Sequence, residues 1–218
     1  MRSKELCIVG NGSLGSFAAL LIGKMASLFG WRMRFLDFDK VERHNLQNQL
    51  FREKDIGRHK SEALAELIAE MSSASPKAEV AKATELTPFR GAVVVLVDNM
   101  AAREAAWLAC RYNYNVHFFV DARSGGDLAL VYAFDPRDPD CVTRYEESLY
   151  GDTEADAAPC ANPRQAPILF FVASVIGELL ARYEEQFPER AEFIQTIIST
   201  TREGLPDLEC WSYTGVSY

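Results

Sequence analysis

The residues best suited to chemistry begin with the glycine pattern Gly10-x-Gly12-x-x-Gly15, directly after the apolar run Leu6–Val9. The second glycine of such a pattern lets the backbone approach a phosphate closely. The helix that follows directs its free N–H groups and positive dipole end at that phosphate. Asp37 comes roughly 20 residues later, where such folds place the carboxylate that binds a ribose hydroxyl. The spacing therefore predicts a site for an adenosine phosphate.

Other polar segments narrow the chemistry, because the glycine pattern alone suits NAD, FAD and S-adenosylmethionine equally well. Asn45-Leu-Gln-Asn-Gln49 comes soon after the ribose acid, and Gly57-Arg-His-Lys60 precedes a predicted helix. Val97-Asp-Asn-Met-Ala-Ala-Arg103 ends an apolar strand and opens another helix. Ligands collect at the carboxyl ends of the strands in an open parallel sheet, and Asp37 and Asp98 both lie at such ends.

The elements that must position these residues alternate between strand and helix over residues 1–121. Residues 92–97 form a continuous apolar run, which is typical of a strand buried on both faces. Such alternation favours a mostly parallel, doubly wound sheet. The predicted strands are 6–9, 32–38, 78–82, 92–97 and 116–120. The predicted helices are 14–28, 61–71 and 101–113, with a short irregular helix at 41–50.

The pattern changes after residue 121. We expect one α/β domain, residues 1–218, with a Rossmann-like, doubly wound, mostly parallel sheet extended by antiparallel strands in the C-terminal part. Residues 1–121 would form its nucleotide-binding half, and 122–218 would carry antiparallel strands, a crossover loop and a C-terminal helix and hairpin. The predicted elements are an antiparallel strand at 128–134, a turn at 135–140, a proline-broken acidic loop at 150–167, an apolar helix at 168–183 and a hairpin of 194–200 with 208–214.

Composition argues against several other classes of protein. The net charge of −8 disfavours nucleic acid as a partner, since phosphate backbones bind a basic face. No membrane partner is expected either, because no apolar run approaches the ~20 residues of a spanning helix. We expect no signal peptide, because a predicted strand and the glycine-rich turn follow the N-terminal residues directly. The five cysteines form no Cys-x-x-Cys pair, and their odd number favours a reducing, cytoplasmic setting.

Taken together, the motifs resemble those of the ThiF/MoeB/HesA family, the adenylating core of ubiquitin-activating enzymes. In that family a glycine loop, an aspartate after the second strand, Asn-Leu-x-Arg-Gln, Gly-x-x-Lys and Asp-Asn-x-x-x-Arg recur in this order. The resemblance covers nearly the whole chain and is densest from Ile8 to Arg103. It implies ATP and Mg²⁺ as ligands and a homodimer. It also implies transfer of AMP to the C-terminal glycine of a ubiquitin-like or sulfur-carrier protein ending in Gly-Gly, with release of pyrophosphate.

The resemblance assigns a role to each matching side chain. Asp37 would accept hydrogen bonds from the ribose hydroxyls, and Asn45 and Gln49 would bind the nucleotide phosphates. Lys60 would place its charge on the phosphates and offset charge that develops in the transition state. Asp98 would hold Mg²⁺, a cation that prefers carboxylate and phosphate oxygens. The same Asp98 also suits the N-cap of the following helix.

Some members of the family pass the acyl group to a cysteine, and here Cys160 is the candidate acceptor. It precedes the apolar helix within the predicted loop. A reactive thiol needs an electropositive, exposed setting. The nearby Arg164 would make the setting of this thiol electropositive. The acidic residues of the same loop would have the opposite effect; they are Asp152, Glu154 and Asp156. The sequence is compatible with Cys160 as a reactive acceptor and with Cys160 as an inert thiol.

Two departures from the family's pattern bear on activity. Asn48 stands where the family has the arginine of Asn-Leu-x-Arg-Gln, so a cation that could grip phosphate is replaced by a neutral amide. Arg43, Arg52 and Arg58 are the nearby arginines that could substitute for it. Many relatives also carry an N-terminal helix whose arginine reaches the partner's site, whereas Arg2 alone precedes the first predicted strand here.

A third departure concerns zinc. Cys141 and Cys210 stand where relatives carry two Cys-x-x-Cys pairs, and each pair has lost its second cysteine. We therefore expect no structural zinc, and we expect packing of Tyr145, Trp211 and Tyr213 to hold this end of the fold instead.

Three functions fit these observations. The first is an ATP-dependent adenylyltransferase that activates a ubiquitin-like or sulfur-carrier protein, with Lys60, Asp98 and Cys160 in the chemistry. The second is a degenerate, non-catalytic subunit that binds nucleotide or carrier and supports an active partner, as Asn48 suggests. The third is a nicotinamide-dependent oxidoreductase, which leaves Asn45, Lys60 and Asp98 without a role.

Overall fold

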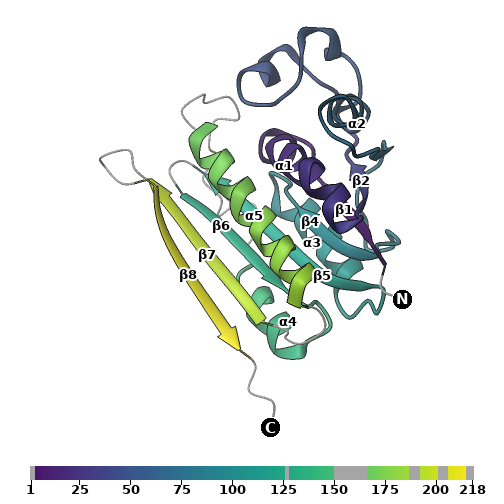
Figure 1. The fold of residues 1–218 in the computed structure, drawn as a ribbon. Coiled ribbons are helices and arrows are strands. Elements are labelled where there is room, and N and C mark those ends of the chain that lie inside the picture. The colour runs from purple at the N-terminus through teal and green to yellow at the C-terminus, as the bar shows by residue number, and fades with distance from the viewer. Residues whose placement is uncertain (1–2, 126–127, 150–165, 187–191, 201–205, 215–218) are drawn as a thin grey trace.

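A computed structural model describes residues 3–125, 128–149, 166–186, 192–200 and 206–214. It confirms the predicted α/β fold (Figure 1). The strands are β1 (Glu5–Val9), β2 (Arg32–Leu36), β3 (Lys77–Glu79), β4 (Gly91–Val95), β5 (Val116–Gly125), β6 (Leu128–Phe134), β7 (Glu192–Thr200) and β8 (Pro206–Thr214). The α-helices are α1 (Ser13–Phe29), α2 (Lys60–Met71), α3 (Met100–Cys110), α4 (Pro139–Glu146) and α5 (Ala166–Gln186), with 3₁₀ turns η1 (Arg43–Gln47) and η2 (Glu53–Asp55).

All these strands belong to one sheet, in the order β3-β2-β1-β4-β5-β6-β7-β8. Strands β1 to β5 are parallel, and β6, β7 and β8 extend the sheet in antiparallel fashion. The chain runs outward from β1 to β3 and then crosses back to β4, so the strand order reverses between β1 and β4. In open α/β sheets ligands bind beyond the carboxyl ends of the strands at such a reversal. The glycine pattern follows β1, and Asp98 follows β4, at this reversal.

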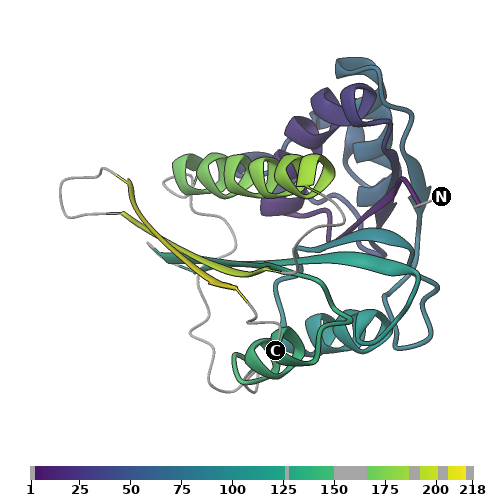
Figure 2. The ribbon, with the colours of Figure 1, turned by 60° about the horizontal axis from the view of Figure 1, so that its bottom comes forward.

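Helices cover both faces of the sheet (Figure 2). On one face α1, α2 and α5 pack on the apolar side chains of β1, β2 and β4, and Ile8, Phe35 and Val94 there are fully buried. On the other face α3 and α4 pack on the opposite side chains of the same strands and of β5. The core of this second face is aromatic, with Trp107 and Tyr145 against Phe119.

The structure corrects three expectations. The segment 135–140 is a turn only at its start, because α4 begins at Pro139 with Asp138 as its N-cap. Proline favours the first helical position, and the Asp138 carboxylate accepts from the N–H groups of Asp140 and Cys141. Strand β2 ends at Leu36 and β3 covers only Lys77–Glu79, so both are shorter than expected. The hairpin of β7 and β8 is as predicted.

Helix α5 is the third correction. At 21 residues it is long and apolar enough, by length and composition, to cross a membrane, although the sequence suggested no such run. Its buried face, which includes Ile168, Val172 and Ile176, packs against α1 and the sheet. This packing is that of a core helix. Phe170 and Phe171 on its outer side are 54% and 41% exposed.

A buried ionic network in the middle of β5 ties the turn that holds Asp98 to the rest of the sheet. Asp121, fully buried, accepts from Arg103 Nε at 2.7 Å, from Arg123 Nε at 2.8 Å and from the Tyr145 hydroxyl at 3.1 Å. The Arg103 guanidinium also donates to the Val97 carbonyl at 2.7 Å. Burial and Asp121 raise the pKa of the Tyr145 phenol well above its usual value, so the phenol stays protonated and donates.

We expect Asp121→Ala to lower the free energy of unfolding by about 3–5 kcal/mol, because it leaves two buried guanidiniums without their carboxylate. Tyr145→Phe removes one hydrogen bond and should cost about 1 kcal/mol. Glu104→Ala, at an exposed position of α3, is the matched control and should change it by less than about 0.5 kcal/mol. Denaturant unfolding measures all three, and equal losses for Asp121→Ala and Glu104→Ala would contradict the assignment.

Candidate functional site

The glycine loop between β1 and α1 is shaped by close backbone approaches. Gly10 has φ +86°, and a Cβ there would lie 2.7 Å from the Leu96 carbonyl oxygen. A Cβ at Gly15 would lie 2.0 Å from the carbonyl oxygen of Gly10. Gly12 differs, since a Cβ there would meet only the side-chain nitrogen of Gln49, at 4.0 Å. Gly10 and Gly15 therefore form the turn, and Gly12 leaves its outer side open.

The open side of the loop leads to the N-terminus of α1. Gly12 is the N-cap residue of α1, and because it has no side chain it offers no side-chain acceptor to the first N–H groups of the helix. Unsatisfied N–H groups together with the helix dipole form a ready site for an anion. The arrangement suits a phosphate lying over Gly12.

Asp37 lies at the end of β2, beside this loop, as predicted, and is buried. Its Oδ2 accepts from the Asn11 N–H at 2.6 Å, and its Oδ1 accepts from the Asp39 N–H at 2.8 Å. Burial raises the pKa of the Asp37 carboxyl, and these two bonds and Lys60 act against that rise. A carboxylate offers about four lone-pair sites, so Asp37 can hold the loop and still accept from a ribose.

Lys60 is the first residue of α2 and is brought to the same place. Its Nζ lies 3.2 Å from Asp39 Oδ2, and its N–H donates to the Asp39 carbonyl at 2.8 Å. Only 11% of its side chain is exposed. Asp39 is thus the ion-pair partner that holds Lys60 beside Asp37.

Asn45 and Gln49 lie in the segment that follows β2. Asn45 is buried, and its Oδ1 accepts from the Glu42 N–H at 2.8 Å, so this oxygen serves the local fold. Gln49 faces the glycine loop, as its distance from Gly12 shows. Its Oε1 is buried and has no hydrogen-bond partner among the described residues. The Leu50 N–H donates to Ser16 Oγ at 3.2 Å and fastens this segment to α1.

Asp98 is exposed at the carboxyl end of β4, where the strand order reverses. The suggestion that it is the N-cap of α3 is wrong. Asn99 is the cap, since its Oδ1 accepts from the Ala102 N–H at 2.8 Å, and its Nδ2 donates to Asp98 Oδ1 at 3.1 Å. Arg103 pairs with Asp121 rather than with Asp98. The Asp98 carboxylate therefore faces solvent next to the loop, where it suits a hard cation.

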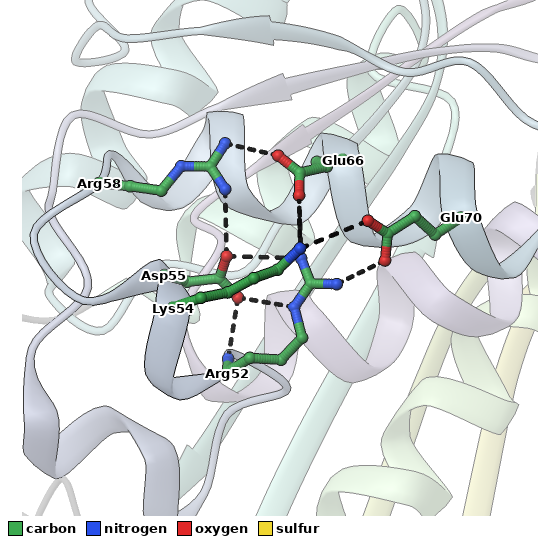
Figure 3. Close-up of polar contacts among 6 residues, drawn as sticks. All are labelled: Arg52, Lys54, Asp55, Arg58, Glu66 and Glu70. Atoms are coloured by element: carbon green, nitrogen blue, oxygen red, sulfur yellow. Dashed lines mark hydrogen bonds and ion pairs between the residues drawn. The ribbon is translucent and has the colours of Figure 1, made fainter.

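The three arginines that could replace the cation missing at Asn48 are all engaged in ion pairs. Arg52 and Arg58 both bind the buried carboxylate of Asp55 (Figure 3). Arg43 pairs with Glu53 at 2.7 Å, with 76% and 65% of the two side chains exposed. An exposed pair of this kind is worth little, so Arg43 is the least firmly held of the three.

Among the cysteines, Cys141 is buried on α4, and burial together with Asp138 raises the pKa of its thiol to about 12. Cys210 lies on β8, and Cys160 and Arg164 lie outside the described residues. Within the described ranges no group of three His, Cys, Asp or Glu side chains could hold a metal ion. Tyr145 packs in the aromatic core as expected.

Sequence reasoning missed two parts of this region. Asn11, the variable residue of the glycine pattern, is fully buried and uses its N–H to hold Asp37. The network of Asp121 and Arg123 was missed because the predicted strand 116–120 stops short of both residues, whereas β5 extends to Gly125. A charged pair within an otherwise apolar strand is the signal that could have found it.

Comparison with known proteins shows which solved structures share this fold. No curated protein matches the sequence. Among solved structures, PaaA superposes with a TM-score of 0.68 at 17% identity over 94% of this chain and 72% of its own. MccB of E. coli solved with ATP superposes with a TM-score of 0.66 at 16% identity, over 96% of this chain and 63% of MccB. MccB solved with succinimide superposes with a TM-score of 0.68 at 16% identity, over 97% of this chain and 65% of MccB. The chain thus spans less than two thirds of the length of MccB.

These similarities establish a shared fold. The sequence itself carries the more specific match, because the model of the ThiF family covers residues 1–184, which contain the glycine loop, Asp37, Lys60 and Asp98. The chain therefore belongs to the ThiF family.

Proposed function

We propose that this protein is an ATP-dependent adenylyltransferase that forms an acyl adenylate on the C-terminal glycine of a small ubiquitin-like or sulfur-carrier protein. The supporting observations are that Gln49 faces Gly12 after β1, that Asp39 holds Lys60 after β2, and that Asp98 follows β4, the strand next to β1. Membership of the ThiF family and the fold shared with MccB, which has been solved with ATP, support the same chemistry.

The reaction needs positioning and charge compensation more than proton transfer. A carboxylate oxygen of the carrier attacks the α-phosphorus of ATP, the bond from that phosphorus to the bridging oxygen breaks, and pyrophosphate leaves with the bonding electron pair. The carboxylate is already deprotonated, so no general base is required. Most of the rate enhancement would come from orientation and electrostatic stabilisation.

Each residue then has a physical task. The N–H groups that open α1 beside Gly12 would hold a phosphate, and the Gln49 amide would donate to the same group. The Lys60 ammonium, fixed by Asp39, would offset charge that develops on the phosphates. Asp37 would accept from the ribose, and Asn45 would keep the segment that carries Gln49 in shape.

Mg²⁺ would be held by the exposed Asp98 carboxylate and, for the rest of its ligands, by phosphate oxygens and water. This fits a metal that binds proteins through one or two carboxylates together with substrate phosphates. Bound there, Mg²⁺ would neutralise the charge that builds on the leaving pyrophosphate. The proposal includes no structural zinc.

The proposed partners are a carrier that ends in Gly-Gly and a second copy of this chain. MccB has been solved in complex with N-formylated MccA, which supports a protein or peptide substrate for this fold. Phe170 and Phe171, exposed on α5, support a homodimer. We propose a cytoplasmic location, since Cys7, Cys110 and Cys141 are free thiols. Nucleic acid and membrane are not proposed as partners.

A non-catalytic subunit is the second candidate. It is favoured by Asn48 and by the ion pairs of Arg43, Arg52 and Arg58, which already engage the alternative cations. Such a subunit would bind ATP in equilibrium dialysis but exchange no pyrophosphate with any carrier, until an active partner is added.

We expect the protein to exchange radiolabelled pyrophosphate into ATP in the presence of its carrier. Asp98→Ala should lower the exchange rate by about 10²–10³-fold, because it removes the protein ligand of the metal. Lys60→Ala should lower the rate by about tenfold or more, since one phosphate-facing charge is lost. Glu62→Gln, at an exposed position in the first turn of α2, is the control and should exchange pyrophosphate at the wild-type rate. Unchanged exchange in Asp98→Ala would refute the assigned role.

We expect Cys160 to accept the acyl group as a thioester, with AMP leaving as the carrier carbonyl bonds to the thiol sulfur. The carrier adduct should be cleaved by added thiol and should be absent in Cys160→Ser, as seen on a non-reducing gel. Cys141→Ser is the control, since that buried thiol should not react. An adduct that persists in Cys160→Ser and disappears in Cys141→Ser would show that the acceptor is Cys141.

A further inference from the structure

The segment that carries Asn45 and Gln49 leaves the sheet after β2 and returns at α2. We name residues 42–59 the excursion. Its two ends are joined by backbone hydrogen bonds, from the Val41 N–H to the Arg58 carbonyl at 2.9 Å and from the Gly57 N–H to the Val41 carbonyl at 2.8 Å. Inside the excursion the described structure consists of the short turns η1 and η2. Side-chain contacts must therefore hold its middle in place.

Asp55 is the centre of those contacts. Its side chain is fully buried. Oδ2 accepts from the N–H and the Nε of Arg52, both at 2.9 Å, and Oδ1 accepts from Arg58 Nη1 at 3.1 Å. Burial disfavours the charged form of Asp55, but the bonds from Arg52 outweigh it and lower the pKa of the carboxyl overall. One carboxylate thus fastens both flanks of η2.

The same arginines also form ion pairs with glutamates of α2 (Figure 3). Arg58 Nη2 lies 2.8 Å from Glu66 Oε2, and Lys54 Nζ lies 2.9 Å from Glu66 Oε1. Arg52 binds Glu70 one turn further along the helix. Glu66 is held ionised, because Lys54 and then Arg58 lower its pKa to about 2. The cluster therefore fixes the excursion against the helix whose first residue is Lys60.

This geometry couples two groups to which we assign phosphate binding. Gln49 lies on the excursion and Lys60 begins α2, so their separation depends on how the excursion sits on α2. Phe51 and the bond from the Leu50 N–H to Ser16 Oγ hold the near side of the excursion against α1. The Asp55 cluster holds its far side. Together these two anchors set the position of Gln49 relative to Gly12.

We propose that Asp55 is a positioning residue for nucleotide binding, acting through the excursion to set the position of Gln49 relative to Lys60. This rests on the proposed function only in taking ATP as the ligand. Because the cluster lies outside the main apolar core, its loss is expected to loosen the excursion without unfolding the sheet.

The test compares Asp55→Asn with the wild type by the dissociation constant for ATP and by amide hydrogen exchange. We expect the dissociation constant to rise about tenfold, since small misplacement of binding groups has large effects. Amide exchange should accelerate in residues 42–58 and stay slow in β1 and β4. At saturating ATP the turnover number should remain near that of the wild type, whereas the KM for ATP should rise. Glu62→Gln, on α2 but outside the cluster, is the control.

A second variant covers the case in which Asp55→Asn does not fold. Glu66→Gln removes the exposed link to α2 and should weaken ATP binding about two- to threefold in the same direction, with a smaller effect in high salt because exposed ion pairs are screened. Faster exchange in residues 42–58 with an unchanged dissociation constant in either folded variant would overturn the proposal. A wild-type protein that binds ATP but exchanges no pyrophosphate would refute adenylation. The ATP dissociation constants of the two variants would still test the positioning role of Asp55.

Discussion

A hydrogen bond from the Asn11 N–H to the Asp37 carboxylate joins the ends of the two strands on which the candidate site is built. Asp37 is buried, and a buried carboxylate is tolerated only when its oxygens are paired. Asn11 and Asp39 provide that pairing from the backbone. The same contact sets the path of the glycine loop, since Asn11 lies between Gly10 and Gly12. The conformation of the phosphate loop and the position of the ribose acid are therefore set together.

Two further buried carboxylates support the segments on either side of this contact. Asp55 serves the excursion after β2, and Asp121 serves the turn after β4 that presents Asp98. Each is shared by two arginines, and each arginine also reaches a second element. Buried ion pairs add little net stability but strongly disfavour alternative arrangements, because breaking one leaves a buried charge unpaired. Such pairs suit a site whose rate depends on preorganised geometry.

Several parts of the fold and site were predictable from the sequence, and the reasons differ. The strands β1 and β4 were predictable because they are apolar runs typical of strands buried on both faces, and α1 because small and apolar residues follow the glycine pattern. Helix α4 was missed because Pro139 resembles a turn residue, although proline also opens helices. Asp98 was predicted as the N-cap of α3, but Asn99 is the cap, and residue type does not separate the two because Asp and Asn cap helices about equally well.

By itself the sequence determined the order of strands and helices, the backbone demands of Gly10 and Gly15, and the set of side chains available for chemistry, because these depend on local spacing and residue type. Only the tertiary structure decided the partners of those side chains. It places Arg103 on Asp121, Arg52 and Arg58 on Asp55, and Lys60 on Asp39. Charged side chains pair across segments far apart in the chain, and desolvation in the folded core determines which pairs form.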